Sequence, residues 1–269
     1  LTKFQQIPQA SSTHAGITLT QFKWIYWWEW FHRNVARTVG LVFAIPWLLF
    51  MVQGRIPRLL RLRLTALPLL TLGQGALGWY MVQSGLVERI SVSAYRLTAH
   101  LGLALGILAV SVWTYSELRE RTMAERSEPV ATPRGWQRAL LSAAVLLGIT
   151  VLSGGFVAGL RGGRIFNEFP LMGGQVFPAS ALALEPWWRY LFESPGFVQF
   201  VHRMTGYLLF VFAVVVWSRG RKSAHPKTRF AFHAMLSAMA LQIALGIVTV
   251  VYGAPWQIAI LHQLLAVIL

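Results

Sequence analysis

Residues 22–53 read FKWIYWWEWFHRNVARTVGLVFAIPWLLFMVQ, and this stretch decides the fold class. Its second part, residues 35–53, is a nearly uncharged apolar run of the length that a helix needs to cross a bilayer, roughly 20 residues. Six further segments have the same character: 64–83, 95–115, 137–157, 199–218, 229–252 and 256–269. The sequence therefore predicts an all-α, polytopic membrane protein.

Composition excludes several other classes of protein. Only 12% of the 269 residues are charged and 55% are hydrophobic, whereas an average soluble domain carries about a quarter charged residues. A soluble enzyme and a disordered chain are both excluded. Cysteine is absent, which removes disulfides, cysteine-ligated zinc or iron–sulfur sites and thiol nucleophiles. The nine acidic residues are all glutamate, which removes Asp-based catalytic triads and Asp-coordinated magnesium.

The net charge of +15 is explained by the position of the charges along the chain. Segments 54–63, 116–136 and 219–228, with the adjoining helix ends, hold 14 of the 24 lysines and arginines. The positive-inside rule places these segments in the cytoplasm, or in the matrix of a mitochondrion. The segments on the other side are longer and rich in tryptophan, as expected at an outer membrane interface. Such a distribution indicates membrane lipid, and no nucleic acid, as the partner of the basic residues.

The chain contains an internal repeat, in which short motifs recur after a nearly constant interval. Phe31-His32-Arg33 recurs as Val201-His202-Arg203, Gln74-Gly75-Ala76-Leu77-Gly78 as Gln242-Ile243-Ala244-Leu245-Gly246, and Ala99-His100-Leu101 as Leu261-His262-Gln263. This pairs the first three spans with the last three and leaves 137–157 without a counterpart. We therefore expect two tandem four-helix transmembrane bundles, eight spans in all, with the first span lying before Leu1.

Four histidines occupy equivalent places in this repeat, at or just inside the outer end of a span: His32, His100, His202 and His262. Polar side chains at this depth are costly and often functional. They could simply form hydrogen bonds between helices. Two repeat-related pairs favour another interpretation, in which each pair ligates one metal. Two imidazoles without nearby acid or cysteine ligands are typical of haem iron.

Further residues near these histidines are candidates for contact with a bound haem. Arg33 and Arg203 directly follow two of the histidines, and Arg96 lies one turn before a third. Guanidinium groups pair with carboxylates, so haem propionates are natural partners, although ordinary helix-end arginines would look the same. Glycines that would let a macrocycle or a neighbouring helix approach are Gly73, Gly75, Gly78, Gly102, Gly106, Gly154, Gly155, Gly159, Gly206 and Gly246.

Glu29 is the candidate catalytic residue. It precedes His32 by three positions, so on a helix both side chains lie on one face, roughly 5–6 Å apart at Cβ. A carboxylate one turn from an iron ligand could act at the edge of a macrocycle. The alternative is an acid that only complements the dipole of a helix N-terminus.

The sequence resembles the haem A synthase family, in the form found in alphaproteobacteria and mitochondria, along essentially all of its length. The motifs that carry the resemblance are residues 22–33, 75–82, Tyr95-Arg96-Leu97-Thr98-Ala99-His100, Gly155-Phe156-Val157-Ala158-Gly159-Leu160, Asn167-Glu168-Phe169-Pro170 and Gln199-Phe200-Val201-His202-Arg203. The Gram-positive form of the family has cysteine pairs in its outer loops, which this chain lacks.

The resemblance implies an enzyme that oxidises a ring methyl group of haem O to a formyl group, which gives haem A for haem–copper oxidases. It implies that His202 and His262 are the axial ligands of a resident haem b that transfers electrons. It likewise implies that His32 and His100 line the site of the substrate haem O, with Glu29 catalytic. The expected organisation is an N-terminal bundle at 1–115, a cytoplasmic or matrix linker at 116–136 and a C-terminal bundle at 137–269.

The resemblance also implies a bacterial cytoplasmic membrane or mitochondrial inner membrane, with both haem sites towards the periplasm or intermembrane space. The expected partners are haem O synthase as substrate donor and ferredoxin or another electron donor, and a homo-oligomer is left open. Two other functions compete. One is a di-haem electron-transfer cytochrome, and the other is a haem carrier or assembly factor without catalysis. Glu29 favours the enzyme, because no acid precedes His202 by three positions.

Overall fold

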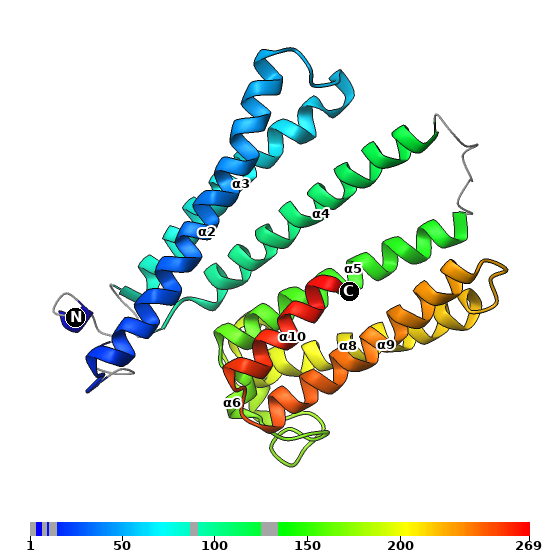
Figure 1. Cartoon of the computed structure of the whole chain (residues 1–269). Coiled ribbons are helices and arrows are strands. Elements are labelled where there is room, and N and C mark those ends of the chain that lie inside the picture. The colour runs from blue at the N-terminus through cyan, green and yellow to red at the C-terminus, as the bar shows by residue number, and fades with distance from the viewer. Residues whose placement is uncertain (1–3, 7–9, 11–14, 87–90, 125–133) are drawn as a thin grey trace. The chain divides into compact units, whose positions relative to one another are not determined.

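The computed structural model describes residues 4–6, 10, 15–86, 91–124 and 134–269. The chain divides into two compact units, Leu1–Val130 and Ala131–Leu269. Each unit is a set of long helices, and the boundary falls within the stretch that the sequence analysis treats as a linker (Figure 1). Part of that stretch is helical, because the helix that precedes it continues to Ala124 and the next begins at Arg134. The described residues contain no β-strand beyond an isolated bridge between Met172 and Gln175.

Unit 1 contains the short 3-10 helix η1 (Phe4–Gln6) and three long helices, α2 (Leu19–Val52), α3 (Arg58–Leu86) and α4 (Ala94–Ala124). Helix α2 packs on α3, and α3 packs on α4. The sequence places a span only from residue 35, but α2 begins at Leu19, where Thr18 and Gln21 form a capping box. The Trp-rich stretch is therefore helical, and Glu29 and His32 lie within a continuous helix.

Unit 2 is built from the long helices α5 (Arg134–Gly159), α8 (Pro195–Gly220) and α9 (Pro226–Val251) and the shorter α10 (Trp256–Ile268). They pack in the order α5 on α8, α8 on α9 and α9 on α10. Leu209, Ala213 and Met239 form the buried core of this bundle. Between α5 and α8 the chain forms four short helices, α6 (Gly162–Ile165), η2 (Ala179–Leu182), η3 (Trp187–Arg189) and α7 (Tyr190–Glu193).

Five described helices are long and apolar enough to cross a membrane: α2, α4 up to Arg121, α5 from Trp136, α8 and α9. Their apolar side chains are largely exposed, as expected for helices that face lipid. Helix α3 covers the expected span 64–83 but is not among the five, because Gln74, four glycines and three arginines dilute its apolar character. Helix α10 is apolar but has only 13 residues. The prediction of an all-α polytopic membrane protein is confirmed.

The segment between α5 and α8 is held against the start of α8 by polar and aromatic contacts. Gln199 is buried, and its side-chain amide donates a hydrogen bond of 2.9 Å to the carbonyl oxygen of Phe166. Phe177 packs its ring edge-on against Phe200, with the ring centres 4.9 Å apart. These contacts hold the segment between α5 and α8 beside the first turns of α8, where His202 is located.

Candidate functional site: paired histidines between helices

His202 of α8 and His262 of α10 come together, although 60 positions separate them in the sequence. Their ring centres are 6.4 Å apart and the ring planes are inclined by 79°. Contacts between α10 and either α5 or α8 are otherwise few among the described residues, because α10 packs mainly on α9. The histidine pair therefore lies where α8 and α10 approach each other across the bundle.

The hydrogen bonds of both rings determine which nitrogen carries the proton. Nδ1 of His202 lies 2.9 Å from the carbonyl oxygen of Thr150, and Nδ1 of His262 lies 3.1 Å from the carbonyl oxygen of Gln242. A carbonyl oxygen only accepts hydrogen bonds, so Nδ1 must be the protonated nitrogen in each ring. Nε2 then keeps its lone pair, which is the form that binds a metal.

This geometry fits a metal held between the two rings. A metal–nitrogen bond of about 2 Å on each side, with each ring centre roughly 1 Å further back, places the ring centres about 6 Å apart. Metal-ligating histidines usually donate their other N–H to a carbonyl or carboxylate, as both rings do here. No group of three or more potential metal ligands occurs among the described residues.

Unit 1 repeats part of this arrangement. His32 of α2 and His100 of α4 lie near enough for their charges to interact, but no ring contact like that of His202 and His262 joins them among the described residues. Gln74 of α3 donates a hydrogen bond of 2.9 Å to the main-chain carbonyl of His100, just as Gln242 of α9 donates one of 3.0 Å to that of His262. In each unit, the side chain of a glutamine thus donates a hydrogen bond to the backbone of a histidine on the following helix, from α3 to α4 in unit 1 and from α9 to α10 in unit 2.

The two units differ at the other histidine of each pair. His32 is exposed, whereas His202 is held by α5 through the Thr150 carbonyl and the hydroxyl of Ser153, which is 3.2 Å from Nδ1. Within unit 1, no described helix occupies the place that α5 has beside α8. The ring of His32 is consequently not oriented by a hydrogen bond among the described residues.

Glu29 forms an ion pair with Arg33, one turn further along α2. Both side chains are about half exposed, at 48% and 52%. They line a small hollow of about 260 Å³ together with Tyr26, Trp30 and Arg37. The predicted catalytic acid therefore lies in an aromatic and basic setting on α2, with its charge compensated by Arg33.

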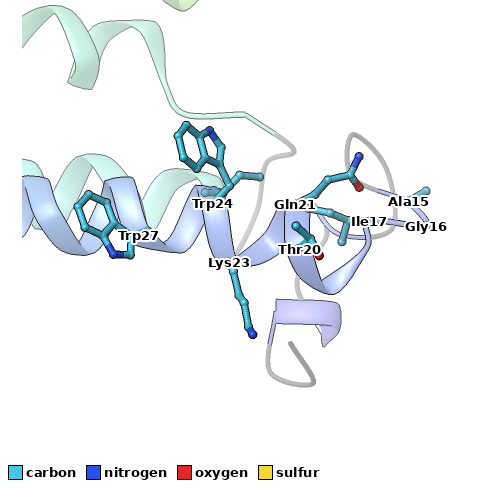
Figure 2. Close-up of a pocket in the computed structure, with 9 residues that line it drawn as sticks. Ala15, Gly16, Ile17, Thr20, Gln21, Lys23, Trp24 and Trp27 are labelled. Carbon is cyan, nitrogen blue, oxygen red and sulfur yellow. The ribbon is translucent and has the colours of Figure 1, made fainter.

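A larger open hollow lies nearer the start of α2 (Figure 2). Gln21, Lys23, Trp24 and Trp27 contribute to its lining, and Figure 2 shows Lys23 and Trp24 extending to different sides of the helix. Neither Glu29 nor any of the four paired histidines lines it. We interpret this hollow as part of the aromatic surface that faces the membrane interface.

The other two arginines also have protein partners. Arg96 donates a hydrogen bond of 2.7 Å to the carbonyl of Tyr80 and its guanidinium lies 3.6 Å from the centre of that ring. Arg203 donates to the carbonyls of Glu168, Pro170 and Leu171 at 2.7–3.1 Å. The predicted contacts of these arginines with haem propionates stay predictions, and Arg203 has a role that sequence reasoning missed, in holding the segment before α8.

Sequence reasoning also missed Thr150 and Ser153, because nothing in the pattern distinguishes them from other small polar residues in a membrane helix. Gln74 and Gln242 appear in the repeat as matched positions, and that match was the available signal for their function. Gly78 and Gly246 are likewise matched positions of the repeat, whereas Gly154 appears only among ten glycines with no stated partner. The structure places all three against histidine rings.

The fold and the histidines together define a class of protein: a helical integral membrane protein with two histidines brought together between the helices of its second unit. The chain belongs to the cytochrome oxidase assembly protein family, COX15-CtaA, whose model matches residues 1–269.

Similar proteins agree with this assignment. The chain is 48% identical to a protein named heme A synthase of Roseobacter denitrificans, over 99% of the chain and 70% of that protein. It is 44% identical to the heme A synthase of Paracoccus denitrificans, again over 99% of the chain and 70% of the relative. The heme A synthase of Nitrosomonas eutropha is 42% identical, over the whole chain and 76% of the relative. No solved structure shows a significant match. The resemblance noted from the sequence is confirmed, and these relatives are named as enzymes.

Proposed function

We propose that this chain is a haem A synthase that oxidises a ring methyl group of haem O to a formyl group. The observation that carries the proposal is the pair His202 and His262, with ring centres 6.4 Å apart and each Nδ1 on a helix carbonyl. Such a pair suits an iron with two axial imidazoles. The names of the relatives, heme A synthase, support haem A as the product, and haem O as the substrate is part of the proposal.

In this proposal unit 2 holds a resident haem b through Nε2 of His202 and of His262. When bound, the haem supplies one-electron redox chemistry. The chain's own contribution is to fix both rings in one tautomer.

Unit 1 receives haem O as substrate, with His32 and His100 at its iron. Glu29 lies on the same face of α2 as His32 and one turn away, so its carboxylate is placed to handle protons at the edge of the macrocycle. Conversion of the methyl group to the formyl group takes two hydroxylations, each a two-electron oxidation that needs an external oxidant and a source of oxygen, and a final loss of water. The chain's own part is proton transfer at that edge. Arg33 forms an ion pair with this carboxylate and so orients it on α2.

A comparison of the two units favours this division of labour. The position three residues before His202 is Gln199, which is buried and donates to the Phe166 carbonyl. A buried amide engaged with the backbone is structural, whereas Glu29 is half exposed beside His32. Unit 1 therefore has an acid on the same helix face as its first histidine, and unit 2 has an amide at the matching position.

A di-haem electron-transfer cytochrome is the second candidate, because each unit brings two histidines together. The two functions make different predictions for the bound pigments. The test is to express the full chain in a membrane that contains haem O, purify it, and extract and identify the haems. We expect haem b together with haem O or haem A. Two equivalents of haem b, with no haem A formed in the cells, would instead support the cytochrome.

A further inference from the structure

Three histidine rings lie against a glycine in nearly the same way. A Cβ atom built on Gly154 would meet Cε1 of His202 at 2.9 Å, one on Gly246 would meet Cε1 of His262 at 3.0 Å, and one on Gly78 would meet Cε1 of His100 at 2.9 Å. In each case the three nearest atoms all belong to the ring. These glycines therefore accommodate an imidazole, and the close approach of a neighbouring backbone does not account for them.

The residue four positions before each glycine supplies the polar contact. Thr150 precedes Gly154 by four residues and its carbonyl oxygen is 2.9 Å from Nδ1 of His202. Gln242 precedes Gly246 by four residues and its carbonyl oxygen is 3.1 Å from Nδ1 of His262. The same spacing and the same pair of contacts thus occur on two different helices, α5 and α9.

Helix geometry explains this spacing. Each Cα–Cβ bond tilts towards the helix N-terminus, so the side chain at position i+4 covers the turn that contains the carbonyl of residue i. That carbonyl already accepts the N–H of residue i+4 and has one lone pair left. A glycine at i+4 uncovers the remaining lone pair, and a side chain from another helix can then donate to it.

We propose that Gly154 and Gly246 are positioning residues for the metal-binding histidines, because the missing Cβ of each opens a helix carbonyl that orients the ring of His202 or His262. The proposal rests on the proposed function in one respect, namely that these two histidines bind an iron. Each glycine sets which nitrogen is protonated and the rotation of the ring, and thereby directs Nε2 towards the metal.

In unit 1, Gly78 repeats the contact between a glycine and a histidine ring but not the hydrogen bond from Nδ1 to a helix carbonyl. The ring of His100 makes the same contact with Gly78, and Gln74, four residues earlier, is the residue that faces it. Nδ1 of His100, however, is buried without a hydrogen bond of normal geometry among the described residues. We therefore expect substitution of Gly78 to leave the resident haem of unit 2 unchanged.

The chain offers a matched control for an experiment on the whole chain. Gly148 lies on α5 with Gly154, and a Cβ on it would have nothing within 4 Å. Gly148→Ala therefore changes helix propensity as Gly154→Ala and Gly246→Ala do, without touching a histidine. The measurements are the electron paramagnetic resonance g values of the ferric haem, its visible spectrum and the haem content per protein.

For Gly154→Ala and Gly246→Ala we expect shifted low-spin g values or a high-spin fraction, with haem content reduced several-fold. Gly148→Ala and Gly78→Ala should keep the wild-type signal of haem b. Unchanged g values and haem content in Gly154→Ala and Gly246→Ala would overturn the proposal. If Gly154→Ala does not accumulate in the membrane, Gly246→Ala decides alone, because its contact of 3.0 Å needs the smaller adjustment.

The outcome is separable from that of the proposed function. Wild-type protein that binds haem b but forms no haem A would refute the synthase activity, while altered g values in the glycine variants would still support the positioning role. Conversely, normal haem A formation with unaltered g values in both variants would leave the synthase standing and remove the role of the glycines.

Discussion

The carboxylate of Glu29 and the guanidinium of Arg33 form an ion pair along one face of α2. An exposed pair of this kind contributes little to stability, in the range of about 0–1 kcal/mol. Its importance lies in the direction of the carboxylate, which is held one turn from His32. Arg33 can serve as a partner of this acid or of a haem propionate, and the substrate would compete with Glu29 for it.

Replacement of Glu29 by glutamine should stop the reaction and spare haem binding. The amide keeps the shape of the side chain but cannot accept a proton, so we expect haem A to fall by roughly 10²-fold or more, the scale of a lost general base. Haem b content and protein abundance should stay normal. Extraction of haems from cells that express the variant measures the effect.

The matched control for this prediction is Glu185→Gln, which removes the same charge from an exposed position in the segment before α8. That variant should form haem A normally. Near-normal haem A from Glu29→Gln would reduce Glu29 to a helix-end acid.

The two histidine pairs should respond differently to alanine substitution. His202→Ala or His262→Ala removes one axial ligand, so the low-spin spectrum of haem b should disappear from the purified protein. His32→Ala or His100→Ala should keep that spectrum and abolish haem A. His225→Ala, in an exposed basic loop, is the control. Equal loss of haem b from all four variants would show that the assignment of the two sites is wrong.

Arg203→Ala should loosen the segment before α8. Three hydrogen bonds to main-chain carbonyls are lost, and those made by a charged donor contribute about 1.5–3 kcal/mol each. We expect limited trypsin digestion after Arg161 and Arg164 to become at least tenfold faster, because local opening precedes cleavage. Arg221→Ala, at the other end of α8, should digest like the wild type, and an equal rate for Arg203→Ala would argue against a role in holding this segment.

The sidedness of the loops can be tested directly, because the chain has no cysteine of its own. A membrane-impermeant maleimide should label Ser180→Cys in intact spheroplasts and should label Ala224→Cys only after permeabilisation. Both positions are exposed in the structure. Labelling of Ala224→Cys in intact spheroplasts would reverse the topology that the basic residues predict.

The sequence by itself determined that the protein is a helical membrane protein with an internal repeat. Apolar runs as long as a bilayer is thick leave no alternative to helices, because each backbone polar group must find its partner within its own segment. The excess of lysine and arginine in alternate loops predicts which side of the membrane each loop faces. The recurrence of His32 as His202 and of His100 as His262 was also readable, since each motif keeps its place in the repeat.

Tertiary structure alone decided how those residues are used. The start of α2 at Leu19 depended on a cap at Thr18, which the hydropathy pattern does not register. Arg203 was readable as a basic residue beside a histidine, but its three acceptors are main-chain carbonyls more than 30 positions away. Likewise, the sequence does not show that the carbonyl oxygen of Thr150 accepts a hydrogen bond from Nδ1 of His202. Every residue carries such a carbonyl, so only the packing of α5 against α8, and the absence of a Cβ at Gly154, determine which one is open to a ligand histidine.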